Sequence, residues 1–209
     1  MPSRGRSGAS TSRRSYGFKR ETDLRRDVEV RDELRTILIV TNGERTEFDY
    51  FMAVKSELWV NAGRVFVKFE PGAPAAVVLR TAFIRDDSDF DEAWTVCDVD
   101  EFDVATAISD ADSRKVNLAL SVPCFEVWLI LHISNSCPGF NYAVQAEKYL
   151  KGLLPGWTKT TLAFANFRNG IDDAIVRAKR LGEPPDANPS TAVWRLIESL
   201  KKASQETDN

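Results

Sequence analysis

The residues best suited to chemistry follow a short apolar run, Ala93–Cys97. Asp98 and Asp100 come directly after it, with one residue between them. Such a run is typical of a strand buried on both faces of a sheet, and ligands of open α/β sheets collect at the carboxyl ends of strands. Hard cations take oxygen ligands, so the pair predicts a site for Mg²⁺ or Mn²⁺. The alternative is that Asp98 closes the strand and caps a helix while Asp100 is solvated.

The acidic character extends beyond this pair. Nine of the eighteen residues from Asp86 to Asp103 are acidic, and none is basic. Like charges at this density repel one another unless cations relieve them, which favours a metal site. A solvated loop at Asp86–Glu92 would explain about half of these acidic residues without a metal.

A second strand and its turn add further acids. Thr36–Thr41 is apolar and β-branched, and it breaks at Asn42 and Gly43, a turn signal. Glu44 and Glu47 follow and lead into an apolar helical pattern. A strand, a glycine turn and a helix place backbone N–H groups and first-turn carboxylates beside a ligand. Glu47 is therefore a candidate metal ligand from the first turn of the helix, and Glu44 is a second candidate.

These elements belong to an alternating series. Strand patterns at Val65–Phe69 and Val116–Leu120 alternate with helical patterns that begin at Pro74 and at Val104. Strands and helices alternating at such distances predict βαβ units and a mostly parallel sheet flanked by helices, the α/β class.

The next helix, Cys124–Ile133, is apolar nearly all round, which predicts burial. Glu126 and His132 are its polar exceptions. Glu126 is either a functional acid or a carboxylate stabilised by the helix dipole alone. His132 is more typical of a hydrogen-bonded core residue than of a catalyst.

Only helical patterns follow, which predicts a helical C-terminal extension. Helices are expected at Ala143–Leu153 and Ile171–Leu181, with a further helical stretch around Thr160–Arg168 between them, and a last helix carries Val193 and Leu196 on its inward face. Asn188–Thr191, with the sequence N-P-S-T, is interpreted as the start of that last helix. A phosphate bound at the helix start is the alternative.

Composition limits the class of protein. The chain has 209 residues, of which 43% are hydrophobic and 28% charged, as in a globular domain. No apolar run is long enough to span a bilayer, and the start lacks the apolar core of a secretory signal, so we expect a cytoplasmic protein without membrane contact. Three dispersed cysteines and one histidine argue against a structural zinc site and a disulfide framework.

Charge is distributed unevenly. Residues 1–20 hold six basic residues and no acidic one, so their net charge is +6. Because the whole chain has a net charge of −3, the remaining residues carry −9. We expect residues 1–35 to form a basic, disordered tail and residues 36–205 to form one domain. An acidic body of this kind would meet nucleic acid through the tail, a metal or a local groove.

Three segments together resemble the RloB-like protein family: Ile37–Phe51 (ILIVTNGERTEFDYF), Val96–Phe102 (VCDVDEF) and Ser121–His132 (SVPCFEVWLILH). The N-P-S-T segment fits the same family. That family is similar to Toprim domains, so the resemblance implies a Toprim-like, four-stranded parallel sheet with an acid after the first strand and D-x-D after the third. It also implies a Mg²⁺-dependent nuclease, acting on DNA or on RNA such as tRNA, in prokaryotic antiviral defence by abortive infection with an ABC-type ATPase partner.

One departure from the family pattern concerns catalysis. The family has an E-G pair after the first strand, where this chain has Asn42 and Gly43. An amide cannot act as a carboxylate base, so the alternative hypothesis is a weakened or inactive subunit that docks on the ATPase. In the nuclease hypothesis Asp98, Asp100 and Glu47 hold the ion, and Glu44 and Glu126 are further ligands or acid/base groups.

Two questions stay open at the level of sequence. A basic residue should offset charge in the transition state, and Arg45, Lys148 and Lys159 are equal candidates. A phosphatase with an aspartyl nucleophile also uses D-x-D after a strand. That mechanism places its nucleophile after the first strand, and no supporting lysine motif is evident here.

Overall fold

The structure is a computed structural model that describes residues 35–57, 59–60, 64–99 and 104–205. All of these belong to one unit, Glu33–Asn209. The expected tail over residues 1–35 lies outside the described residues except for Arg35, and Asp100 lies outside them too. The expected domain limits therefore stay predictions.

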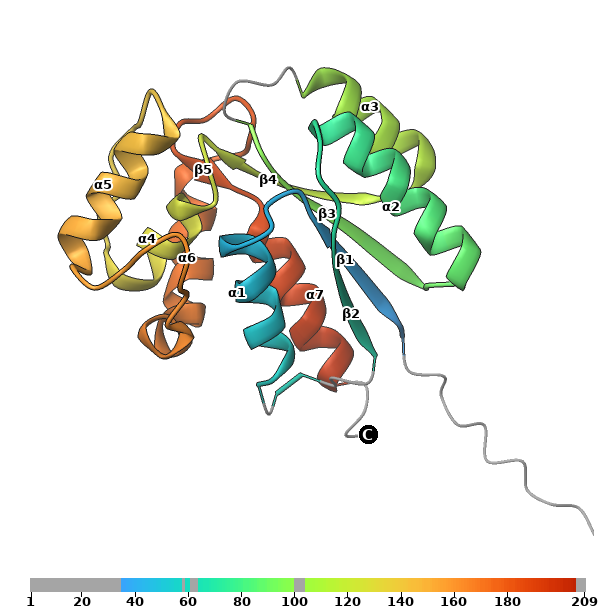
Figure 1. Cartoon of the computed structure of the whole chain (residues 1–209), viewed down its shortest axis with the longest axis horizontal. Helices are drawn as coiled ribbons and strands as arrows, with labels where there is room; N and C mark the ends of the chain where they lie inside the picture. Colours follow the sequence, from blue (N-terminus) through green and yellow to red (C-terminus); the bar gives the residue numbers. More distant parts are fainter. Residues whose placement is uncertain (1–34, 58, 61–63, 100–103, 206–209) are drawn as a thin grey trace, which may run out of the picture. The chain divides into compact units, whose positions relative to one another are not determined.

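Strands and helices alternate as far as α4, and the rest of the described chain is mainly helical (Figure 1). The elements are β1 (Ile37–Thr41), α1 (Thr46–Lys55), β2 (Val65–Phe69), α2 (Pro74–Ser88), β3 (Glu92–Asp98), α3 (Ala105–Arg114), β4 (Asn117–Val122), α4 (Glu126–Ile133), α5 (Ala143–Leu153), the short 3₁₀ helices η1 (Phe164–Asn166) and η2 (Arg168–Gly170), α6 (Ile171–Leu181), β5 (Ser190–Thr191) and α7 (Val193–Gln205).

The sheet has the strand order β2-β1-β3-β4-β5. The first four strands are parallel, and β5 pairs with β4 in the antiparallel sense. The predicted α/β class and mostly parallel sheet are confirmed, and the arrangement is consistent with a Toprim-like fold. The predicted number of four strands is wrong by one, because β5 adds a short fifth strand. Since β2 lies on one side of β1 and β3 on the other, the chain reverses its direction of winding between β1 and β3, where open α/β sheets bind ligands.

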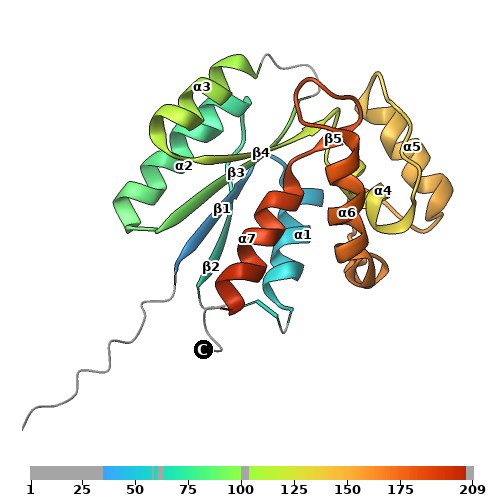
Figure 2. The ribbon, with the colours of Figure 1, turned by 180° about the vertical axis from the view of Figure 1, so that it is seen from behind.

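The alternation of side chains along β1 separates two cores. Ile37 and Ile39 face α1 and α7, whereas Leu38 and Val40 face the side covered by α2. Figure 1 and, from behind, Figure 2 show α1 and α7 on one face of the sheet and α2 and α3 on the other. Both faces of β1 are buried, which explains why its sequence is a continuous apolar run.

Helix α4 packs against α5 and α6 and is buried over nearly its whole length. His132 is part of this core. Its Nδ1 lies 2.9 Å from the carbonyl oxygen of Trp128, and its Nε2 lies 3.1 Å from Tyr50 Oη. Because a carbonyl oxygen only accepts, Nδ1 carries the proton and Nε2 accepts the proton of Tyr50. The interpretation of His132 as a hydrogen-bonded core residue is confirmed.

The N-P-S-T segment does not start a helix, which corrects the prediction. Ser190 and Thr191 form β5, and α7 begins at Val193. Thr191 Oγ1 lies 2.9 Å from Ser121 Oγ and accepts the backbone N–H of Val193 at 3.3 Å. The segment therefore fastens the last helix to the edge of the sheet. Among the described residues, none of the helices has the length and hydropathy that a membrane span requires.

Candidate active site

Strands β1 and β3 bring two predicted residues to the same edge of the sheet. Thr41, the last residue of β1, pairs with Val96, and the backbone N–H of the next residue, Asn42, donates to the Val96 carbonyl at 3.1 Å. Asp98 ends β3 two residues further on. Because the strands are parallel neighbours, both side chains lie at the carboxyl edge, at the point where the winding reverses.

Helix α1 supplies Glu47 from its first turn, as predicted. The side chain is only 7% exposed, and its carboxylate packs against the α-carbon of Gly43 so closely that a Cβ at that position would overlap it. The turn is braced by Thr41 Oγ1, which donates to the Gly43 carbonyl at 3.0 Å. Glycine at position 43 therefore leaves the space in which the Glu47 carboxylate lies.

Helix α4 supplies Glu126, its first residue, which is 1% exposed. Lys159 Nζ lies 3.9 Å from Glu126 Oε1 and 2.7 Å from Glu147 Oε1 of α5. The distance to Glu147 is that of a charge-assisted hydrogen bond, whereas the distance to Glu126 is an ion pair without one. Glu147 thus holds Lys159 beside the buried carboxylate.

These groups meet in one pocket of about 450 Å³. It is lined by Asn42, Gly43, Glu44, Arg45, Thr46, Glu47, Asp98, Glu126, Lys159 and Thr160. Every predicted site residue that the structure describes lines it, and only Asp100 lies outside the described residues. Of the three candidate basic residues, Arg45 and Lys159 line this pocket, whereas Lys148 lines a different hollow beside Phe140.

Three oxygen atoms of the pocket are buried without a hydrogen-bond partner in the described part of the chain. They are Asn42 Oδ1, Asp98 Oδ1 and Glu126 Oε1. A buried polar atom without a partner costs about 1–3 kcal/mol, and more when it is charged. Three such atoms from three separate elements indicate a site that is completed by a bound group with positive charge or hydrogen-bond donors.

Burial and mutual repulsion dominate the electrostatics. Burial, followed by the charges of Glu47 and Glu126, raises the pKa of Asp98 well above its usual range. Burial also raises the pKa of Glu47 to about 7 and that of Glu126 above its usual range. The pKa of Lys159 is raised although burial opposes it, because the hydrogen bond to Glu147 and the attraction of Glu126 outweigh burial. Lys159 therefore stays charged and offsets only part of the acidity of the pocket.

The donor set fits a hard divalent cation. As the side chains lie, no group of three histidine, cysteine, aspartate or glutamate residues among the described ones is arranged around a common metal position. Mg²⁺ does not require such a group, because it is usually held by one or two carboxylates together with waters and substrate phosphates. Asp98 and Glu126 are carboxylates that each have one oxygen without a hydrogen-bond partner among the described residues, and Asn42 offers an amide oxygen. The predicted placement of Asp98, Asp100 and Glu47 around one ion stays a prediction.

Sequence reasoning missed Glu147, which positions Lys159. A signal for it was present, since Glu147 is the only acidic residue between Glu126 and Asp172. Its partner could not be identified, because the contact joins α5 to the loop after it only once both pack beside α4.

The sequence comparisons agree with this fold and site. The model of the RloB-like protein family matches residues 37–200, which include every described residue of the pocket. The chain belongs to the RloB-like protein family. Searches among curated proteins and among solved structures gave no significant match.

Proposed function

We propose that this chain is a divalent-metal-dependent nuclease. The observation that carries the proposal is a set of three buried oxygens, on Asn42, Asp98 and Glu126, that have no hydrogen-bond partner among the described residues and share one pocket at the carboxyl edge of β1 and β3. Carboxylates that are buried with too little positive charge are suited to Mg²⁺ or Mn²⁺, and a site that lacks a full set of protein ligands leaves room for a substrate phosphate.

The residues of the pocket have distinct roles in this proposal. Asp98 and Glu47 hold the ion, with Asn42 as a neutral oxygen donor and Asp100 as a further ligand. A bound Mg²⁺ would neutralise the scissile phosphate and orient water for attack. Lys159, held by Glu147 at 2.7 Å, offsets negative charge that develops on the phosphate.

Glu126 is the proposed acid/base residue. It is buried at the start of α4, and one of its oxygens accepts no hydrogen bond from the described residues. Burial raises its pKa, which makes the carboxylate a better proton acceptor at neutral pH. Glu44 lines the same pocket and is exposed, so it is a candidate for contact with the substrate rather than for proton transfer.

Membership of the RloB-like family supports the wider proposal that the nuclease acts in prokaryotic antiviral defence by abortive infection, in the cytoplasm, with an ABC-type ATPase as partner and RNA, tRNA or DNA as substrate. A second candidate function is a weakened or inactive subunit that docks on the ATPase. The observation in its favour is Asn42, because an amide adds no negative charge for the ion and cannot accept a proton.

The test is a cleavage assay with the full chain, with and without the ATPase. RNA, tRNA and DNA are incubated in Mg²⁺, in Mn²⁺ and in EDTA, and Asp98→Asn serves as the matched variant. Cleavage that requires a divalent ion and is lost in Asp98→Asn supports the nuclease. If neither the wild type nor Asn42→Glu cleaves any substrate with the partner present, the docking subunit is the correct function.

A further inference from the structure

We propose that α5 and the loop that follows it, residues 154–161, bind the single-stranded part of a nucleic-acid substrate and lead it to the pocket. This inference rests on the proposed nuclease function and names the form of its substrate. Residues 143–161 contain three basic residues and one acidic residue, Glu147, in a chain whose net charge is −3.

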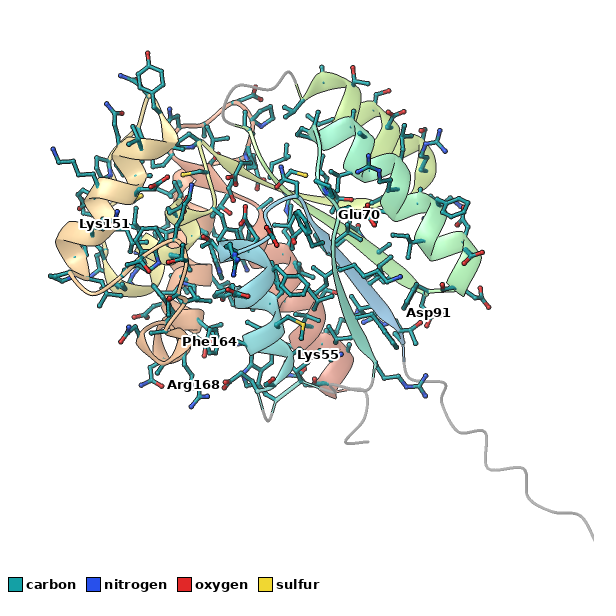
Figure 3. All side chains as sticks on the ribbon, viewed as in Figure 1. Lys55, Glu70, Asp91, Lys151, Phe164 and Arg168 are labelled. Carbon is teal, nitrogen blue, oxygen red and sulfur yellow. The ribbon has the colours of Figure 1, made fainter. Side chains whose placement is uncertain are left out.

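The one acid in this segment is already paired, because Glu147 binds Lys159 at 2.7 Å. Lys148 and Lys151 are exposed and have no acidic partner within salt-bridge distance among the described residues. Figure 3 places Lys151 on α5. An anion approaching this acidic molecule would therefore meet net positive charge on α5.

The lysines of α5 are continuous with the pocket. Glu147 and Lys148 lie three and four residues after Val144, and Lys151 lies four and three residues after them, so the four residues share one face of the helix. Glu147 on this face contacts Lys159, which lines the pocket beside Glu126. A phosphate backbone that follows Lys151 and Lys148 would arrive at Lys159.

Next to these lysines is a hollow suited to an unpaired base. It has a volume of about 420 Å³ and is lined by Phe140, Gln145, Lys148, Tyr149, Gly152 and Leu153. The rings of Phe140 and Tyr149 lie 5.7 Å apart and are tilted by 59° to one another. Tyr142 and Val144, at the start of α5, are 62% and 65% exposed. Phe140 is only 5% exposed, so Tyr142 and the half-buried Tyr149 are the rings that a base can reach. Aromatic side chains beside lysines bind single strands, whose bases are free to stack, whereas the bases of a duplex are not.

Gly152 allows a sharp test, because a Cβ at this position meets no atom of the described residues within 4 Å. Gly152→Gln and Gly152→Glu should occupy the hollow without disturbing the fold, and a helix-interior glycine is itself destabilising. Lys148→Glu with Lys151→Glu tests the charge. The matched control is Arg114→Glu with Lys202→Glu, which reverses two exposed charges on α3 and α7.

Binding is measured on the full chain in EDTA by fluorescence anisotropy, with oligo-U, oligo-dT and a mixed-sequence DNA duplex as probes. We expect both single strands to bind more tightly than the duplex. The lysine double variant and Gly152→Glu should weaken single-strand binding at least tenfold, Gly152→Gln should weaken it less, and the control variant should change it less than twofold. A preference for oligo-U or oligo-dT identifies RNA or DNA.

Three results would overturn the inference: no single-strand binding, equal affinity for the duplex, or equal weakening in the control. Loss of ATPase binding in the lysine variant with unchanged oligonucleotide binding would also overturn it and would assign α5 to protein docking. The assay needs neither metal nor cleavage. Single-strand binding without cleavage would therefore count against the nuclease proposal and leave this inference standing.

Discussion

The carboxylate of Glu47 lies directly against the α-carbon of Gly43, four residues earlier, in space that a side chain at position 43 would fill. The turn after β1 and the first turn of α1 therefore determine together where this carboxylate points.

This relationship predicts the effect of Gly43→Ala. The overlap involves the end of a flexible side chain, so the free energy of unfolding should change by less than about 1 kcal/mol. The Glu47 carboxylate must move, and affinity for Mn²⁺ should fall about tenfold. The control is Gly156→Ala, because a Cβ at Gly156 meets no atom within 4 Å in the described part of the chain. Unchanged Mn²⁺ affinity in Gly43→Ala would show that the position of Glu47 does not matter for the metal.

The raised pKa of Glu47 predicts how stability depends on pH in the absence of metal. Between the ordinary value, 4.5, and about 7, the folded protein holds a proton that the unfolded chain has lost. The stabilisation is therefore complete below pH 4.5 and is lost as pH rises through about 7, by up to about 3 kcal/mol.

Glu47→Gln should remove this dependence. In EDTA the variant should be more stable than the wild type at pH 8 and about equally stable at pH 5, as measured by urea unfolding. Adding Mg²⁺ at pH 8 should stabilise the wild type more than the variant. A variant that is less stable than the wild type at pH 8 in EDTA would contradict the repulsion inferred for the pocket.

Lys159 allows a test that separates charge in the transition state from metal binding. Lys159→Met should lower kcat about 100-fold, which is typical when one group that stabilises a developing negative charge is lost. Because it also removes positive charge from beside Glu126, it should strengthen Mg²⁺ binding rather than weaken it. Lys159→Arg should keep most of the activity. A normal kcat in Lys159→Met would assign the role to Arg45.

Substitution of His132 should lower the free energy of unfolding and leave metal binding in the pocket unchanged. Burial lowers its pKa to about 4, so the ring is neutral at pH 7, and its stabilising effect is lost as pH falls from 6.5 toward 4. His132→Leu leaves the hydroxyl of Tyr50 without its partner and should cost about 2–3 kcal/mol. Denaturant unfolding and Mn²⁺ binding, measured on the same sample, check this. Lost Mn²⁺ binding at full stability would show that His132 supports the pocket directly.

Most of the fold could be predicted from the sequence, because its periodic patterns are local. The limits predicted for Val65–Phe69, Ala143–Leu153 and Ile171–Leu181 agree with β2, α5 and α6. Strand β5 could not be predicted in this way. It has two residues, and it exists because β4 offers Ser121 and Val122 as partners. The helix-start pattern of the same segment is a local signal that this tertiary pairing overrides.

The residue types of the site could be predicted from the sequence, whereas the contacts between its side chains could not. Asn42, Glu47 and Asp98 follow strand ends, and parallel strands bring such positions to one edge of a sheet. The choice of Lys159 over Lys148 was not accessible, because it depends on how α5 packs beside α4 and which lysine Glu147 then reaches. The buried oxygens of Asn42, Asp98 and Glu126 lack a hydrogen-bond partner among the described residues, and this too depends on packing and not on any sequence pattern.

Mn²⁺ binding, followed by electron paramagnetic resonance, tests the proposed metal site directly, because bound Mn²⁺ loses the signal of the free ion. It is measured at pH 7.5 on the wild type, Asp98→Asn and Asn42→Glu. The wild type should bind Mn²⁺ in competition with Mg²⁺, and Asp98→Asn should bind it at least tenfold more weakly. Asn42→Glu should bind it more tightly, because it adds a carboxylate beside Asp98. If the wild type binds no Mn²⁺, or if Asp98→Asn binds it with the same Kd, the pocket is not a metal site.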